Sequence, residues 1–477
     1  MNATELQREY FDMLEDFFAA ATGKPPSAVS APESIKELML DRLRHDHDSF
    51  AREINASADE LAVFYRTHTH TLMDAAKSIG GVKLVLGGGS GFGRTQQAAV
   101  RKMLLYCDSV LIPDPVARFF EADRFDQAIH LQMAQEAYQL LQLRPLVSAD
   151  LATPPVLVFP SLERALEDQD RVTQIGIERL TVAVVNASCG ADLVSLADVF
   201  SYTRSHEREF LKGAAEARLL IAPGEQVTDA ADPNRMIEKY VEGLQGRRDP
   251  KYLERLQREP PGVIGALMLS ERLSRQFHLL ENARAFAAQP MLTIPAQWHY
   301  YELAARAEME ELVNDRVISA GAFTTLRSIQ DPSLKWLGDI PADVLAELLQ
   351  RGENREFRRR LKQFTEQLHS VAPQDLEATT KEVMVGINAL IAEHQREIGD
   401  IQARYAPKFK NTLIAGVVSA AAFLPVLAPL VGPVVPLLAG GGVATAYVRD
   451  KLQERAERQK ARSSLLGVLA AAAPKTA

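Results

Sequence analysis

Cysteine is nearly absent from this sequence, which has only Cys107 and Cys189 among its 477 residues. Neither residue has a second ligand at a metal-binding spacing, and two thiols cannot form the framework of a disulfide-rich secreted domain. Apolar residues surround both cysteines. We therefore expect two buried thiols in a reducing compartment.

An excess of basic residues is also missing, because 54 Lys and Arg face 62 Asp and Glu and the net charge is −8. This balance disfavours a protein built mainly to hold nucleic acid. The N-terminus, MNATELQREYFDMLEDFFAAATG, is acidic and amphipathic and lacks the basic region and apolar core of a secretory signal. These absences predict a cytoplasmic protein whose partner is not nucleic acid.

The rest of the composition, 47% hydrophobic and 24% charged, is that of an ordinary globular protein with about two to four domains. Residues 1–78 and 226–345 are expected to be helical. In the first of these regions, the apolar side chains at helical spacing are Tyr10, Phe11, Leu14, Phe17 and Phe18.

Residues 79–225 differ, because short apolar runs bounded by Gly, Pro, Asn or Ser alternate with helical patterns. Such alternation predicts a small, partly parallel β-sheet covered by helices. The runs expected to be strands are 82–86, 110–112, 156–159, 180–185 and, most weakly, 219–222.

Residues 346–407 have the pattern of one or two long polar helices. An apolar stripe from Val383 to Tyr405 at near-heptad spacing is typical of a coiled-coil arm or a long bundle helix. The predicted fold is therefore mostly α with a small α/β unit and a long C-terminal helical arm that ends in a hydrophobic helical hairpin. The predicted regions are 1–78 (helical), 79–225 (α/β), 226–345 (helical), 346–409 (arm) and 410–477 (hairpin and tail).

A glycine loop at 87–95 is the strongest local motif. VKLVLGGGSGFGRTQQAAV (82–100) reads as a strand, a glycine run and a helix, and 88–95 fit the phosphate-loop pattern G-x-x-x-x-G-K-[ST] except for one arginine. Arginine is longer and planar, so it does not replace the lysine unchanged. Three interpretations stay open: a nucleotide site, a site for another anion or small ligand, and a structural turn. The residues that would line a site are Gly88, Gly91, Gly93, Arg94 and Thr95.

Other chemistry-bearing patterns are weak. Histidine and aspartate gather at 45–48 and histidines at 68–70, but no second cluster supplies the remaining metal ligands, so no metal site is predicted. No G-x-S-x-G elbow and no H-E-x-x-H pair occurs. Ser188-Cys189-Gly190 follows a strand-like run and has no assignable base. These absences favour a non-enzymatic function and name no cofactor.

A basic segment, RGENREFRRRLK at 351–362, has six basic and two acidic residues. We interpret it as a solvated helix face with Phe357, Leu361 and Phe364 as the buried stripe. Contact with anionic lipid or nucleic acid is the alternative, and lipid is favoured because of the segment that follows.

Residues 411–448 contain no charged side chain over 38 positions. One straight helix of this length would span roughly 57 Å, whereas a bilayer core is about 30 Å thick. Four prolines, at 425, 429, 433 and 436, interrupt it and favour a hairpin of two short helices with a turn near 429–433. The side chains expected to meet the membrane are Leu413, Val417, Phe423, Leu424, Leu427, Leu430, Val434, Leu437 and Leu438.

Both flanks of this stretch are basic, and 449–462 have a net charge of +3. By the positive-inside rule both ends stay in the cytoplasm, which agrees with a hairpin rather than a single crossing. A permanently buried core hairpin and an oligomer interface remain alternatives. The residues expected at lipid headgroups are Lys408, Lys410, Arg449 and Lys451.

Two segments carry a resemblance to a group of proteins. LLYCDSVLIPDPVARFF (104–120) resembles a leucine-rich helix followed by a strand that ends in Pro-Asp-Pro, and SLKWLGDIPADVLAELLQRGENREFRRRLKQF (333–364) resembles a second element of the same proteins. These are uncharacterised bacterial proteins, some from anti-phage defence neighbourhoods. The resemblance implies a bacterial cytoplasmic protein that acts as a defence effector or sensor, and it defines no catalytic residue.

The leading hypothesis is therefore a non-enzymatic protein that assembles with itself or a protein partner and brings the hairpin to a lipid bilayer. One alternative is a nucleotide- or anion-binding switch or enzyme that uses the glycine loop. The other is a soluble interaction scaffold whose hairpin is part of the core.

Overall fold

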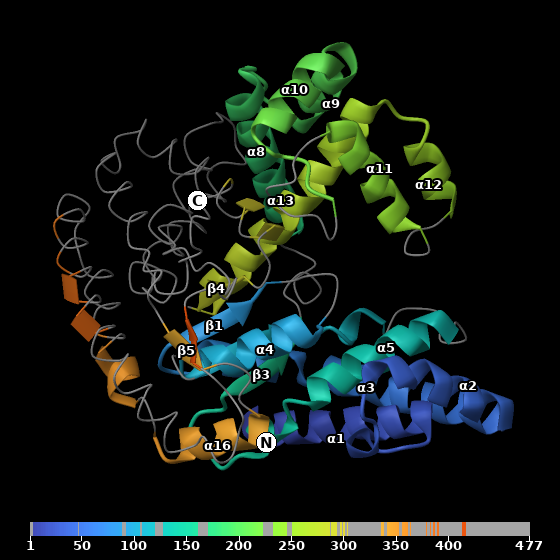
Figure 1. The fold of residues 1–477 in the computed structure, drawn as a ribbon, viewed down its shortest axis with the longest axis vertical. Coiled ribbons are helices and arrows are strands. Elements are labelled where there is room, and N and C mark those ends of the chain that lie inside the picture. The colour runs from blue at the N-terminus through green and yellow to red at the C-terminus, as the bar shows by residue number, and fades with distance from the viewer. Residues whose placement is uncertain are drawn as a thin grey trace.

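Two hydrophobic cores organise the part of the chain that the computed structural model describes. They form two lobes, and helix α13 (Pro261–Ala285) runs from one into the other (Figure 1). The described residues are 3–45, 47–87, 92–104, 107–119, 127–160, 170–222, 232–245, 250–286, 288–292, 296–297, 299–300, 335–337, 341–352, 355–360, 385–386, 389–390 and 413–415, with the single positions 303, 363, 378 and 382.

The first lobe contains a parallel sheet of four strands: β1 (Lys83–Leu86), β2 (Ser109–Pro113), β3 (Val156–Phe159) and β4 (Gln289–Met291). Their order is β3-β2-β1-β4. Every side chain of β1 and β3 is buried, as expected for a parallel sheet covered by helices. The prediction of a mostly helical protein with a small α/β unit is confirmed.

Helices surround this sheet (Figure 1). The apolar stripe predicted within residues 1–78 lies on helix α1 (Ala3–Thr22) and is fully buried, which confirms the helical spacing predicted from the sequence. The helices of this lobe are α1 (Ala3–Thr22), α2 (Ile35–His45), α3 (His47–Ser78), α4 (Arg94–Met103), α5 (Gln127–Leu141), α6 (Arg144–Ser148) and α16 (Ala342–Gln350), with short 3-10 turns η1 (Pro26–Ala28), η2 (Pro32–Ser34) and η3 (Ala117–Phe119).

Buried polar side chains join the layers of the first lobe. The Gln7 amide of α1 donates to the Val158 carbonyl and accepts from the Val158 N–H, both at 2.8 Å, so it extends the outer edge of β3 as a neighbouring strand would. The Lys83 ammonium donates to the carbonyls of Ala76 and Lys77 at the end of α3, at 2.9 and 3.0 Å. These contacts satisfy backbone groups that the sheet edge and the helix end leave open.

The second lobe is helical. Its helices pack closely where glycine allows it: a Cβ at Gly213 would lie 2.7 Å from the Ser188 carbonyl oxygen, and one at Gly262 would lie 2.6 Å from the Thr203 carbonyl oxygen. The lobe consists of α8 (Asp170–Cys189), α9 (Leu196–Ser205), α10 (Glu207–Glu216), α11 (Pro233–Leu244), α12 (Pro250–Leu256) and the first half of α13.

Two of the predicted strands were wrong. Residues 180–185 lie inside the 20-residue helix α8, because their buried positions repeat at the helical spacing of Ile177, Leu180, Thr181, Val184 and Val185. Residues 219–222 form no strand. Their backbone is held instead by Tyr300, whose hydroxyl donates to the Leu219 carbonyl at 2.7 Å and accepts the Ile221 N–H at 3.0 Å.

Strand β4 was missed, because it is only three residues long and contains Pro290. A proline fits there because β4 is at the edge of the sheet and needs no hydrogen bond on its outer side.

The C-terminal arm is described only in part. Helix α16 ends at Gln350, and Gly352 with φ of 70° turns the chain before a helical segment at 355–360. Phe357 is buried as predicted, whereas Leu361 and Phe364 lie outside the described residues. The predicted region boundaries stay predictions.

A short antiparallel pair corrects the start of the predicted helical hairpin. Leu413–Ala415 is strand β6, paired with β5 (Lys335–Leu337). Apolar and β-branched residues favour strands as well as membrane helices, so the composition did not decide between them. The rest of the predicted hairpin lies outside the described residues. Within the residues that are described, no helix is both long and apolar enough to cross a bilayer.

Candidate functional site

The carboxyl edge of the parallel sheet is where this fold favours a ligand. The chain passes from β1 to β2 to β3 in one direction and then returns to β4 on the other side of β1. The change of direction lies between β1 and β4, and ligands of open parallel sheets bind outside the strand ends at such a point. The predicted glycine loop leaves β1 there, so the strand order places it at the favoured edge.

Gly87, the first residue of this loop, is tightly enclosed. Its N–H donates to the Met291 carbonyl at 2.7 Å. A Cβ at this position would lie 3.0 Å from Leu279 Cδ2 and 3.1 Å from the Met291 carbonyl oxygen, so glycine lets β1, β4 and α13 meet. Gly88 and Gly91 lie outside the described residues.

The end of the loop is held by the chain's own acceptors. The buried carboxylate of Glu136, on α5, accepts the Phe92 N–H at 2.5 Å, and the Gln96 side chain accepts the Gly93 N–H at 3.1 Å, as in one half of a capping box. An anion that used these two N–H groups would have to displace both acceptors. The nucleotide interpretation of the loop stays a prediction, and these two N–H groups are already hydrogen-bonded within the protein.

Arg94 and Thr95 begin helix α4 and are exposed. The Arg94 guanidinium forms an ion pair with Glu33 of η2 at 3.4 Å. The arginine that replaces the phosphate-loop lysine is thus engaged with a neighbouring element.

The middle of α13 runs past the same edge of the sheet. Leu279 packs against Gly87 at the end of β1, and Gln276 and Arg272 precede it by one and two helical turns. Gln276 is 4% exposed, and its Oε1 has no hydrogen-bond partner among the described residues. The same is true of the buried Arg272 Nε within that part of the chain. Burial lowers the pKa of Arg272, and the neighbouring Arg275 lowers it further.

A buried carboxyl group, that of Asp114, directly follows the end of β2. Asp114 Oδ2 accepts the Tyr10 hydroxyl at 2.5 Å and also accepts the Tyr65 hydroxyl, while Oδ1 accepts the Val116 N–H at 2.7 Å. Burial raises the pKa of Asp114, and these hydrogen bonds oppose that rise. Burial likewise raises the pKa of Tyr10 and Tyr65. The cluster is satisfied internally and joins α1, α3 and β2.

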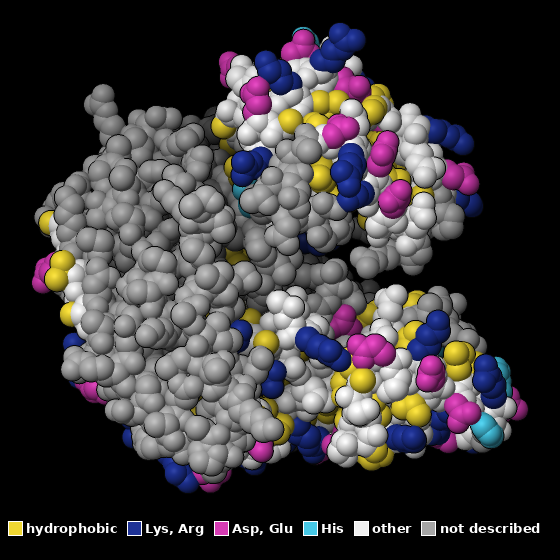
Figure 2. All heavy atoms as spheres, viewed as in Figure 1, with side chains coloured by type: hydrophobic (Ala, Val, Ile, Leu, Met, Phe, Trp, Pro, Cys, Tyr) yellow, Lys and Arg dark blue, Asp and Glu magenta, His cyan; other side chains and the backbone are white. Residues whose placement is uncertain are grey.

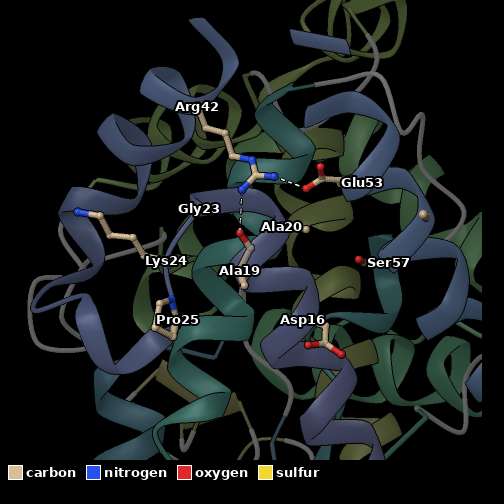
Figure 3. Close-up of a pocket in the computed structure, with 10 residues that line it drawn as sticks. Asp16, Ala19, Ala20, Gly23, Lys24, Pro25, Arg42, Glu53 and Ser57 are labelled. Atoms are coloured by element: carbon tan, nitrogen blue, oxygen red, sulfur yellow. Dashed lines mark hydrogen bonds and ion pairs between the residues drawn. The ribbon is translucent and has the colours of Figure 1, made fainter. Parts of the chain in front are cut away.

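An open groove of ≈ 540 Å³ lies between the end of α1 and helices α2 and α3 (Figure 3). Arg42 spans it, donates to the Ala19 carbonyl at 3.3 Å and pairs with Glu53. This arginine closes the C-terminal end of α1, so the contact is structural. The groove is lined by Asp16, Ala19, Ala20, Gly23, Lys24, Pro25, Arg42, Glu53, Ala56 and Ser57.

The two thiols are unsuited to nucleophilic catalysis. Burial raises the pKa of Cys107 far above its ordinary value and that of Cys189, the last residue of α8, to about 11. Both therefore stay protonated at neutral pH. No cluster of histidine, cysteine and acidic side chains that could hold a metal ion occurs in the described part of the chain.

Charges of both signs are interspersed over both lobes on the face shown in Figure 2. The residues predicted to meet lipid lie outside the described part of the structure, apart from the backbone of Leu413 in β6.

The Asp114 cluster and the polar positions of α13 were not predicted as functional residues. Asp114 follows a predicted strand, which was a usable signal, but its tyrosine partners lie 104 and 49 positions away. Gln276 and Arg272 carry no sequence motif. No protein-family model, curated protein or solved structure matches this chain.

Proposed function

We propose that this chain is a membrane-directed protein whose uncharged segment, residues 411–448, docks on or inserts into a lipid bilayer. The observation that carries the proposal is a run of 38 residues without charge between basic flanks. Its sixteen Leu, Ile, Val and Phe side chains favour insertion by about 5–10 kcal/mol in total, which proline and polar groups partly offset. A segment with so small a net preference for lipid is suited to moving between a protein environment and a bilayer.

The flanks give this segment an orientation. Lys408 and Lys410 before it and Arg449 and Lys451 after it would meet anionic headgroups on one side of the membrane. Both described lobes have extensive cores of their own side chains, which suits a folded body that carries a membrane segment. The first residues of the segment, Leu413–Ala415, pair with β5 and would leave it on insertion. The resemblance to proteins of defence neighbourhoods adds the expectation of an effector or sensor that assembles before it acts.

Flotation and dye release with vesicles of anionic lipid test this proposal on the full chain. We expect Leu430→Lys to reduce both, because the bend of the hairpin has to pass into the hydrocarbon core, where a lysine costs up to about 2.5–3.5 kcal/mol. Val194→Lys is the matched control, since Val194 is 86% exposed in the second lobe and takes no part in the proposed segment. If wild type and Leu430→Lys float and release dye equally, the segment does not meet lipid and the chain is better explained as a soluble scaffold.

A second function, the binding of a nucleotide or another small anion, is favoured by the strand order that places the glycine loop between β1 and β4. The test is a thermal shift of the full chain with ATP, GTP and Mg²⁺. A ligand at about 100 times its dissociation constant stabilises by roughly 2.7 kcal/mol. No shift with any of these ligands would remove this second function and leave the membrane proposal untouched.

A further inference from the structure

Gln276 is a buried side chain with an unused acceptor. It is 4% exposed, and its Oε1 has no hydrogen-bond partner in the part of the chain that the structure describes. Buried polar atoms are almost always paired, because an unpaired one loses its hydration and gains nothing in return. An unpaired acceptor beside a favoured ligand edge suits a partner that the described residues do not supply.

The position of Gln276 follows from its spacing on α13. Leu279 contacts the end of β1 at Gly87, and the helix continues from there over the sheet and leads into β4 (Figure 1). Gln276, three residues earlier, shares the face of Leu279 and lies one turn further out, beyond the carboxyl edge. Arg272, four residues before Gln276, continues the same face outward.

The charged neighbours of Arg272 leave its Nε unused. Arg275 forms the ion pair with Glu271 at 2.6 Å, and the Tyr240 hydroxyl donates to the same carboxylate at 2.6 Å. Arg272 lies two turns from Leu279 toward the second lobe, near Glu271, Tyr240 and Tyr300, and its Nε has no hydrogen-bond partner among the described residues. This face of α13 therefore carries one acceptor and one cationic donor that the described residues leave unpaired.

We infer that Gln276 and Arg272 are ligand-binding residues of the carboxyl edge and that the ligand is a nucleoside phosphate. Gln276 Oε1 accepts a hydrogen bond from a ribose hydroxyl or a base amino group, and Arg272 Nε donates to a phosphate oxygen. This inference rests on the second proposed function and adds the residues and the ligand class. The site consists of Gln276 and Arg272, and the phosphate is bound from α13.

Asn282 provides an internal comparison. It is 5% exposed, and its Oδ1 also lacks a hydrogen-bond partner within the described residues. It lies one turn beyond Leu279 in the opposite direction, over the sheet and away from the edge. A change at Asn282 alters a buried amide of the same helix without touching the inferred ligand.

Isothermal titration of the full chain tests the inference with ATP, ADP, adenosine and pyrophosphate as separate probes. We expect Gln276→Met to weaken ADP binding about tenfold, the factor of a lost hydrogen bond of ~1.4 kcal/mol, without lowering the Tm of the ligand-free protein. Arg272→Lys is expected to weaken ADP and pyrophosphate but not adenosine. Asn282→Leu is expected to leave all affinities unchanged.

The outcomes separate the inference from the function it rests on. If wild type binds ADP and Gln276→Met and Arg272→Lys bind it equally well, the edge has a ligand but these two residues do not contact it, and the inference is overturned. If Asn282→Leu weakens binding as much as Gln276→Met, the effect is one of helix packing, and the inference is again overturned. If wild type binds none of the probes, the second proposed function fails and the inference with it.

Discussion

The contacts inside the first lobe differ in kind from the contacts inside the second lobe. In the first lobe, buried polar side chains such as Gln7, Lys83 and Asp114 join helices to the ends and edges of strands. In the second lobe, helices approach closely at Gly213 and Gly262. A small sheet leaves backbone groups open at its edges, and side chains must satisfy them, whereas helices satisfy their own backbone and need mainly complementary shape.

The largest effect is expected from Asp114→Ala, which breaks the polar ties of the first lobe. The change removes the acceptor of the Tyr10 and Tyr65 hydroxyls and of the Val116 N–H. Each buried donor that loses its partner costs about 1–3 kcal/mol, so we expect a loss of about 4 kcal/mol in the free energy of unfolding. Urea unfolding followed by circular dichroism measures it.

The control for this change removes the donors together with the acceptor. In Tyr10→Phe with Tyr65→Phe and Asp114→Leu, the hydroxyls and the carboxyl leave together, and the groups that lose a partner are the backbone N–H groups of Val116 and Ala117. We expect this triple variant to be more stable than Asp114→Ala. A loss below 1 kcal/mol in Asp114→Ala would show that the cluster does not hold the lobe together.

A smaller loss, about 1–3 kcal/mol, is expected from Gly213→Ala in the second lobe. The new Cβ would lie 2.7 Å from the Ser188 carbonyl oxygen and 2.9 Å from Cys189 Sγ, and α8 and α10 would have to separate. Gly80→Ala is the matched control, because a Cβ there meets nothing within 4 Å. Thermal unfolding of both variants decides the point, and equal Tm values would mean that the helices do not depend on close approach.

The same difference between lobes explains which elements could be predicted. Strands β1, β2 and β3 were predicted because Gly, Pro or Ser bounds each short apolar run. The run at 180–185 has a similar composition but a boundary only at one end, at Asn186, and packing against the other helices of its lobe makes it part of α8. A window of six residues does not distinguish these cases, because apolar β-branched residues fit both environments.

Only the part of the candidate site whose residues are consecutive in the sequence could be predicted. The glycine loop was found because Gly87 to Thr95 are consecutive, and its place at the edge between β1 and β4 needed the strand order. Gln276 was invisible in the sequence, since it differs from any other helical glutamine only by what surrounds it. Long-range placement, not local propensity, decided these positions.

The contributions of Asp114 in the first lobe and Glu271 in the second lobe to stability are expected to change with pH in opposite directions. Burial raises the pKa of Asp114 in the first lobe. In the second lobe, burial alone would raise the pKa of Glu271, but the Tyr240 hydrogen bond and the charges of Arg275 and Arg272 outweigh it and lower the pKa. A group whose pKa is higher in the folded than in the unfolded protein stabilises the fold fully at pH below its unfolded pKa, and this stabilisation is lost as pH rises through its folded pKa. A group whose pKa is lower in the folded protein stabilises the fold at pH above its unfolded pKa, and this stabilisation is lost as pH falls through its folded pKa.

The Tm of wild type should therefore change relative to two variants in opposite directions. As pH falls from 7 to 4, the Tm difference between wild type and Asp114→Asn should shift in favour of wild type, and the difference between wild type and Glu271→Gln should shift against it. Differential scanning calorimetry at several pH values measures both differences. Parallel pH trends in the two comparisons would contradict the assigned directions.

The smallest effect is expected from the exposed ion pair of the first lobe. Arg94 and Glu33 are 3.4 Å apart with side chains 67% and 73% exposed, whereas Arg275 and Glu271 of the second lobe are 2.6 Å apart and 37% and 25% exposed. Water and salt screen the exposed pair, so a double-mutant cycle with Arg94→Ala and Glu33→Ala should give a coupling below about 0.5 kcal/mol that vanishes in 1 M salt. The same cycle on Arg275 and Glu271 should give a larger coupling that salt reduces less. Equal couplings would mean that burial does not distinguish the two pairs. A strong Arg94–Glu33 coupling would mean that the loop arginine is fixed in place, and so unable to reach a ligand at the edge of β1.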